Sequence, residues 1–182
     1  MTTGLRWPAE QPTLRAEDVV LRPWRPGDAE AVFRACQDLE IQRWTTVPSP
    51  YRLADAEWFV DIAAQLWDPA VGCAFAAVDE HDEVLLGSFG IVASDPGDAR
   101  GEVGYWTSPW ARRRGAAVAG LRQLTKWALQ QVGYRSLEAV VDHGNDASIA
   151  VARKAGYSEP TDARPPLRVD GPDDAVVLVR TG

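Results

Sequence analysis

The sequence is poor in cysteine and histidine. Its two cysteines, Cys36 and Cys73, and its two histidines, His81 and His143, show none of the short spacings that mark a zinc site. Two cysteines are also too few for a disulfide scaffold. We therefore expect buried, reduced thiols and no bound metal.

Long apolar runs are missing as well. No stretch of about 18 uncharged apolar residues occurs, and the opening "MTTGLRWPAEQP" lacks a cationic start followed by an apolar run. We expect a cytoplasmic protein without a membrane partner. Its 182 residues, of which 46% are hydrophobic, suit a single domain over residues 1–182.

The sequence has fewer basic than acidic residues. Lys and Arg number 19 against 26 Asp and Glu, which gives a formal net charge of −7. This balance argues against nucleic acid as a partner and would attract a cationic ligand such as an amine.

Several common phosphate and nucleophile motifs are absent. No G-x-x-x-x-G-K-[ST] is present, and no G-x-G-x-x-G follows a strand, which excludes the usual P-loop and dinucleotide-binding signatures. The segment "GSFG" at 87–90 does not match the G-x-S-x-G elbow of hydrolases.

The residue pattern that is present predicts an α/β (α+β) fold with a mixed, mostly antiparallel sheet and helices on both faces. Three strands over 72–80, 83–94 and 99–107 should form an antiparallel meander. Helical periodicity covers 53–67, 115–132 and 145–154. Other strands are expected at 19–24, 137–141 and 175–180, and an irregular, aromatic loop at 38–51 is expected to line a substrate pocket.

Residues 101–120, "GEVGYWTSPWARRRGAAVAG", join a strand to a helix through three arginines and a glycine. Gly104 allows a bulge or a close backbone approach, so that a ligand backbone would pair with this strand. The helix start offers unpaired N–H groups to a phosphate. A ligand with a phosphorylated end and an amide-rich arm, such as coenzyme A, fits this order.

These residues resemble the GNAT acetyltransferase superfamily. Arg112-x-x-Gly115-x-Ala117 is similar to its pyrophosphate loop, and "GEVGYW" to the RimJ/RimL-type branch. The segment "NDASIAVARKAGY" at 145–157 is similar to a second motif of that branch, and the likeness covers most of the chain. Acetyl-CoA is then the co-substrate, and the expected cofactor-binding residues are Tyr105, Trp106, Thr107, Arg112, Arg113, Arg114, Gly115, Ala116, Ala117 and Asn145.

The resemblance also implies catalytic residues. Many GNAT enzymes carry a tyrosine as general acid where this chain has Ala152, and Ser148 is the expected stand-in as proton donor. Glu102 is the expected base, acting directly or through a water, unless it only pairs with Arg100 or another surface arginine. A backbone N–H near Gly104 would stabilise the oxyanion. Substrate contacts are expected from Trp44 and Glu102, whereas two other tryptophans, Trp58 and Trp67, are expected in the core.

The sequence predicts an N-acetyltransferase that acts on a protein N-terminal α-amine or on a small-molecule amine. A non-catalytic acyl-CoA-binding or regulatory domain is the alternative, because the tyrosine is replaced by Ala152. A protein-interaction domain without CoA affinity is a third possibility. Exposed tryptophans and the late strands also offer a surface for a homodimer.

Overall fold

The computed structural model describes residues 4–16, 18–81, 83–161, 165, 167–168, 172 and 174–182. One eight-stranded sheet has the order β1-β2-β4-β5-β6-β7-β8, with β3 paired to β4. The strands are β1 (Leu14–Ala16), β2 (Val19–Arg22), β3 (Trp67–Asp68), β4 (Gly72–Asp79), β5 (Leu85–Asp95), β6 (Arg100–Thr107), β7 (Ser136–Asp142) and β8 (Ala175–Thr181). The predicted meander is confirmed as β4, β5 and β6, which pair antiparallel.

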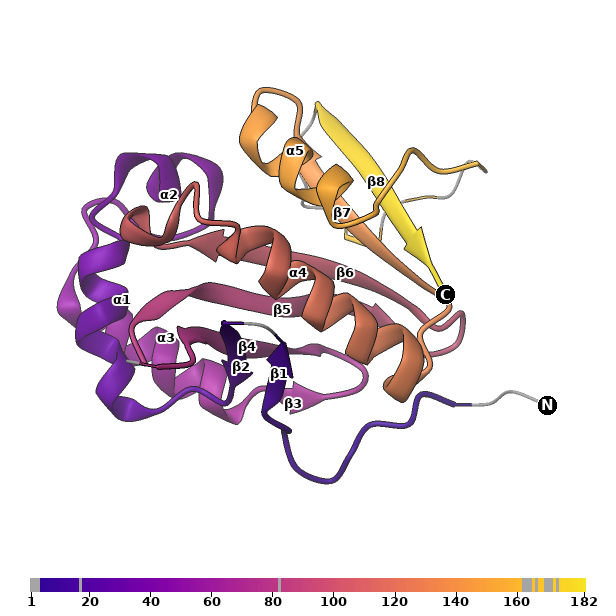
Figure 1. Ribbon diagram of the computed structural model, residues 1–182, viewed down its shortest axis with the longest axis horizontal. Helices are drawn as coiled ribbons and strands as arrows, with labels where there is room; N and C mark the ends of the chain where they lie inside the picture. Colours follow the sequence, from indigo (N-terminus) through magenta and orange to yellow (C-terminus); the bar gives the residue numbers. More distant parts are fainter. Residues whose placement is uncertain are drawn as a thin grey trace.

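Among the described strands, β6 and β7 form the parallel pair, and their pairing is short. The register covers Arg100–Glu102 against Ser136–Glu138. Beyond Glu102 the two strands diverge, and Figure 1 shows β7 and β8 leaning away from β6 on the side where α2 lies. The mixed, mostly antiparallel sheet is confirmed, with a V-shaped gap between β6 and β7.

Helices cover both faces of the sheet, as predicted (Figure 1). On one face, α1 and α3 pack over a core that contains Val32, Ala56 and Val60. On the other face, α4 and α5 pack over a core that contains Leu121 and Leu124. The helical segments are η1 (Pro26–Asp28), α1 (Ala29–Ala35), α2 (Leu39–Trp44), α3 (Leu53–Gln65), η2 (Pro109–Ala111), α4 (Ala116–Trp127), the π-helical η3 (Ala128–Val132) and α5 (Asp146–Lys154).

The apolar spacing of α4 explains its position. Leu121, Leu124, Ala128 and Val132 recur every three or four residues and are all fully buried, so they form one face of a continuous helical segment. Burial of each leucine stabilises the fold by about 2 kcal/mol. The segment ends at Gly133, whose positive φ of 95° allows the left-handed C-cap predicted from the sequence.

Three expectations for the first half of the chain were wrong. Residues 39–44 form the helix α2 rather than an irregular loop, because Asp38 caps it and Ile41 is buried beneath it. The next helix ends at Gln65, and Trp67 belongs to β3. Trp58 is 66% exposed, since it lies on the side of α3 opposite to the buried Ala56 and Val60.

The tryptophan prediction holds at Trp67. Its ring contacts the rings of Trp7 and Trp127, with centroids 4.6 and 5.7 Å away. Cys36 and Cys73 are buried free thiols, as expected. Burial raises the pKa of the Cys73 thiol to about 12, so it stays protonated.

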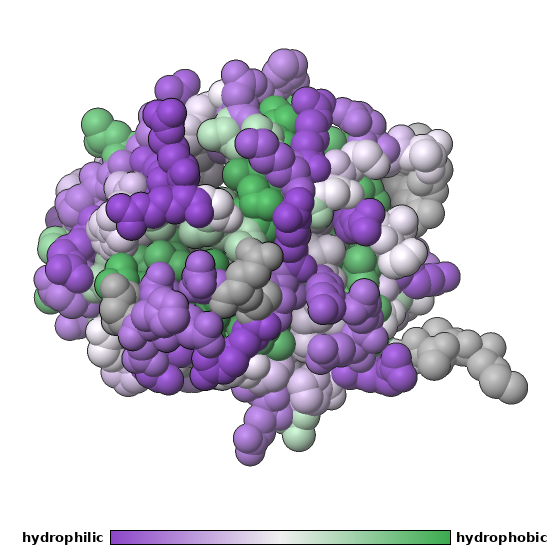
Figure 2. All heavy atoms as spheres, viewed as in Figure 1, coloured by the Kyte–Doolittle hydropathy of each residue, from purple (hydrophilic) through white to green (hydrophobic). Residues whose placement is uncertain are grey.

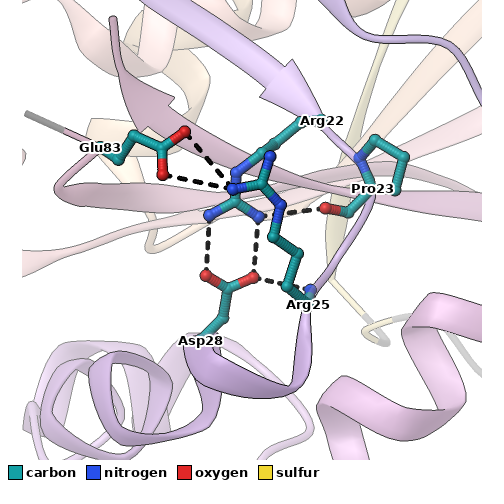
Figure 3. Close-up of polar contacts among 5 residues, drawn as sticks. All are labelled: Arg22, Pro23, Arg25, Asp28 and Glu83. Carbon is teal, nitrogen blue, oxygen red and sulfur yellow. Dashed lines mark hydrogen bonds and ion pairs between the residues drawn. The ribbon is translucent and has the colours of Figure 1, made fainter. Parts of the chain in front are cut away.

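A buried ion pair attaches the first helix to the sheet. The guanidinium of Arg22 in β2 donates two hydrogen bonds of 2.8 Å to the carboxylate of Asp28, which also accepts from the backbone N–H of Arg25. Figure 3 shows this pair beside the solvent-exposed contact of Arg25 with Glu83. Because the Arg22 and Asp28 side chains are only 5% and 12% exposed, the pair joins β2 to η1 away from water.

Hydrophilic residues cover most of the face shown in Figure 2, and the hydrophobic residues that reach it form small groups. Among the described residues, no helix has the length and apolar character needed to cross a membrane. Between α5 and β8 the structure describes residues 155–161, 165, 167–168, 172 and 174.

Candidate active site

The gap between β6 and β7 is the centre of the candidate site. Past Glu102, the β7-side edge of β6 faces this gap, since the β6–β7 register ends there. Free strand edges present unpaired backbone N–H and C=O groups to any extended chain. Residues Gly104, Tyr105, Trp106 and Thr107 are half-buried along this edge. This geometry suits the predicted amide-rich arm.

Tyr105 spans the gap to the helix on the other side. Its hydroxyl lies 2.8 Å from Oγ of Ser148 and donates to the Ser148 carbonyl oxygen at 3.0 Å. The ring stacks on Phe89, with centroids 5.6 Å apart and planes within 8°. Burial raises the pKa of the Tyr105 hydroxyl to about 12, although its bond to Ser148 opposes this shift. Tyr105 is therefore protonated at neutral pH.

Asn145 fixes the position of Ser148. Its side-chain oxygen accepts a 3.0 Å hydrogen bond from the backbone N–H of Ser148, so Asn145 is the N-cap of α5. Asn145 is thus an N-cap, and the cofactor contact expected of it stays a prediction. Ser148 thus lies in the first turn of α5 and is half-buried.

Glu102 approaches the gap from the opposite face of the sheet. Successive strand residues alternate between faces, and Tyr105 packs with the α4 core whereas Trp106 packs with the α1–α3 core. Glu102 shares the face of Trp106 and is 6% exposed at the point where β6 leaves β7.

The charged neighbours of Glu102 decide which form of the arginine-pairing alternative applies. Arg100 donates to Glu138, the residue opposite Glu102 in the strand register, with Nε 2.8 Å from Oε1. Glu102 itself lies 3.9 Å from the guanidinium of Arg168. Arg100 therefore pairs with Glu138, and the arginine beside Glu102 is Arg168, which fits the second form of the alternative. Two buried carboxylates, Glu102 and Glu138, lie on adjacent strands.

The bulge expected at Gly104 occurs on the neighbouring strand. The β5–β6 register shifts between Ile91 and Ala93, so Val92 is the extra residue. A β-carbon on Gly104 would lie 2.5 Å from Cγ1 of Val92. The Val92 side chain therefore makes the close approach that the absence of a side chain at Gly104 allows.

The start of α4 carries the predicted phosphate loop. Gly115 is the N-cap with φ of 82°, a left-handed conformation that favours glycine, and Arg113 has a φ of 63°. Arg113, Arg114 and Gly115 are exposed, whereas Ala116 is buried and Ala117 half-buried. The first N–H groups of an α-helix lack intrahelical partners, so an anion can bind here.

The side chain of Arg112 contacts Asp38, the N-cap residue of α2. Its Nη2 lies 2.6 Å from Oδ1 of Asp38 and its Nη1 lies 3.1 Å from Oδ2, which is a two-pronged contact. This hydrogen-bonded pair is the main reason why the pKa of Asp38 falls below its usual range. Asp38 also accepts from the backbone N–H of Ile41 and so caps α2.

Trp44 lies at the end of α2, across from the turn that begins α5. The guanidinium of Arg43 lies 4.4 Å from the Trp44 ring centroid, and Trp44 Nε1 donates to Glu40 at 2.9 Å. A β-carbon on Gly144 would lie 3.2 Å from Cη2 of Trp44. The Trp44 ring therefore approaches the wall of the gap that carries Asn145 and Ser148.

Comparison with known proteins decides the family. Residues 18–158 match the family model described as "Acetyltransferase (GNAT) domain". The chain belongs to the GNAT acetyltransferase family. This GNAT protein is 24% identical to the uncharacterized N-acetyltransferase YoaA of Bacillus subtilis over 148 residues, 81% of this chain and 84% of YoaA.

Solved structures share the GNAT fold. A proposed ribosomal-protein-serine acetyltransferase of Vibrio cholerae is similar with a TM-score of 0.81 and 20% identity, covering 93% of this chain and 97% of that one. RimL, a ribosomal L7/L12 α-N-protein acetyltransferase solved with coenzyme A, is similar with a TM-score of 0.77 and 16% identity. That match covers 93% of this chain and 98% of RimL. The predicted GNAT family and its fold are confirmed, and the chain is an acetyl-CoA-dependent acetyltransferase of that family. Membership of the RimJ/RimL-type branch stays a prediction, with which these structural neighbours are consistent.

Sequence reasoning missed two contacts of this GNAT site. It assigned Tyr105 to the cofactor and Ser148 to catalysis, but not the hydrogen bond between them, which joins residues 43 positions apart. It also missed the pairing of Arg112 with Asp38, 74 positions away. The one local signal was Asp38 itself, a good N-cap residue before "LEIQRW".

Proposed function

We propose that this GNAT enzyme moves an acetyl group from acetyl-CoA to the N-terminal α-amine of a protein or peptide. One observation carries the proposal: the β6 edge and the Tyr105–Ser148 pair border one gap, and the start of α4, with its left-handed Gly115, lies near the open end of that gap (Figure 1). A strand edge, a proton-bearing hydroxyl pair and an anion site are the three features that thioester transfer from coenzyme A requires.

The proposed cofactor site follows the shape of coenzyme A. Amide groups of its arm would lie along Tyr105–Thr107, and its diphosphate would meet the N–H groups of Gly115–Ala117. Arg113 and Arg114 are exposed beside this loop and supply positive charge. Asn145 holds the α5 wall of the gap through its N-cap bond.

The proposed proton path uses both faces of the sheet. The amine nitrogen attacks the thioester carbon, the C–S bond breaks, and the thiolate takes a proton from Ser148 Oγ. Ser148 regains a proton from the Tyr105 hydroxyl, 2.8 Å away, which is then replenished from solvent. Glu102 accepts the proton that the amine loses, directly or through a water.

The pKa of the acceptor supports an α-amine. An α-amine has a reference pKa of about 7.7–8.0, so roughly a tenth is neutral at pH 7, whereas well under a thousandth of a lysine side chain is neutral. A buried carboxylate such as Glu102 then suffices as base. The RimL neighbour, named as an α-N-protein acetyltransferase, supports the same acceptor class.

Thiol release with a panel of acceptors tests the proposal. Peptides with a free α-amine should be acetylated, and the same peptides with a blocked N-terminus and a free lysine should not. Glu102→Gln should lower kcat and change the pH–rate profile, and an unchanged profile would eliminate the role of Glu102 as base. Transfer only to small amines, or tight binding of acetyl-CoA with no transfer to any acceptor, would contradict the proposal.

A further inference from the structure

Arg112 differs from the two arginines that follow it. Arg113 and Arg114 are exposed at the start of α4. Arg112, at the end of η2, is half-buried, and its side chain is directed toward α2. Both of its Nη atoms contact the Asp38 carboxylate, at 2.6 and 3.1 Å. A two-pronged contact fixes the direction of both side chains, which a single hydrogen bond does not. In this arrangement both Nη atoms of Arg112 are directed at a protein carboxylate.

Asp38 also caps α2, so the contact that fixes its carboxylate restrains this helix as well. Oδ1 of Asp38 accepts from Arg112 and also from the backbone N–H of Ile41, 3.0 Å away. α2 has only six residues, too few to be stable alone. Its position therefore depends on the buried Ile41 and on the carboxylate that Arg112 holds.

The far end of α2 reaches the other wall of the gap. Trp44 is its last residue, and its ring lies close to Gly144, next to the N-cap Asn145 of α5. Figure 1 shows α2 at the open end of the gap, near the start of α4. α2 thus connects the phosphate loop to the turn that positions Ser148.

We propose that Arg112 is a positioning residue for the acceptor site, acting through Asp38 and α2, and is not a ligand of the coenzyme phosphate. The inference rests on the proposed function, because it takes the acceptor to bind beside Trp44, the residue expected from the sequence to contact the substrate. Arg112, the first residue of the Arg112-x-x-Gly115-x-Ala117 motif, then has a different role from Arg113 and Arg114, which remain the proposed phosphate contacts.

Paired kinetics and binding test this assignment. Arg112→Lys keeps the charge but loses the two-pronged contact, and Asp38→Asn keeps an N-cap oxygen but loses the charge. Both should raise the KM for an α-amine peptide about tenfold, as expected when a charge-assisted contact is lost. The Kd of acetyl-CoA should stay within about twofold in both. Arg114→Gln, the matched control, should weaken acetyl-CoA about tenfold without changing the peptide KM.

Hydrogen exchange separates this inference from the proposed function. In both Arg112→Lys and Asp38→Asn, the amides of residues 41–44 should exchange at least tenfold faster than in the wild type, while Arg114→Gln leaves them unchanged. If the wild type acetylates no peptide but α2 exchange rises in this way, the proposed function fails, while the restraint of α2 by Arg112 through Asp38 stands. Unchanged α2 exchange, or a loss of acetyl-CoA affinity in Arg112→Lys equal to that in Arg114→Gln, would overturn the inference.

Discussion

At the scale of single residues, we propose that the Tyr105–Ser148 pair supplies the proton for the leaving thiolate. In this proposal the pair takes the role of the tyrosine that many GNAT enzymes carry where this chain has the buried Ala152. Since burial holds the pKa of Tyr105 near 12, the hydroxyl remains a donor throughout the neutral range. Without Tyr105, Ser148 would lose the neighbouring hydroxyl that replaces the proton it donates.

Removal of the Tyr105 hydroxyl tests this role. Tyr105→Phe keeps the ring stacked on Phe89 but removes the bond to Ser148. We expect kcat to fall by about 10²-fold or more, the range for loss of positioned proton transfer, with little change in acetyl-CoA affinity. Single-turnover kinetics and calorimetry measure the two quantities. Equal losses in both would indicate that the hydroxyl only shapes the binding gap.

The Asp38–Arg112 pair makes stability depend on pH. Because the pKa of Asp38 is lowered in the folded state, its contribution is fully present above the unfolded pKa of about 3.9 and is lost as pH falls through the folded value. Asp38→Asn should cost about 1 kcal/mol at pH 6, and this difference should shrink below about pH 4. Urea denaturation of both proteins between pH 6 and 3.5 measures it. A constant difference across this range would contradict the assignment.

At the scale of elements, ion pairs and close contacts hold helices to the sheet. Arg22–Asp28 joins β2 to η1, away from water (Figure 3). Asp28→Asn should leave a buried guanidinium uncompensated and lower the free energy of unfolding by about 3 kcal/mol. Glu83→Gln is the matched control, because that carboxylate and Arg25 are 62% and 57% exposed and their pair should contribute little. Equal effects of the two changes in thermal unfolding would refute this view.

The packing of α4 on β5 is tight at Gly120. A β-carbon there would lie 2.8 Å from the ring of Phe89, which stacks on Tyr105. Gly120→Ala should therefore destabilise the protein by about 1–3 kcal/mol and also lower kcat through displacement of Tyr105. Adding Phe89→Leu, which frees space, should restore part of the stability. Wild-type stability in Gly120→Ala alone would show that the Phe89 ring moves without cost.

At the scale of the whole molecule, the local signals of the sequence were sufficient for most elements. α4 and α5 carry helical periodicity with Gly133 and Asn145 at their ends, and the β4–β6 meander has turns between its strands. α2 was missed because a six-residue helix depends on a carboxylate whose partner is 74 residues away. The length of the β6–β7 pairing has no local signal either, so the gap itself could not be predicted.

The central claim is that coenzyme A occupies this gap, with its diphosphate at the start of α4. A crystal structure of the protein soaked with coenzyme A tests it most directly. We predict density for the amide-rich arm along Tyr105–Thr107 and for the diphosphate at the N–H groups of Gly115–Ala117. Coenzyme density at another surface, with the gap and the α4 start left empty, would contradict the account.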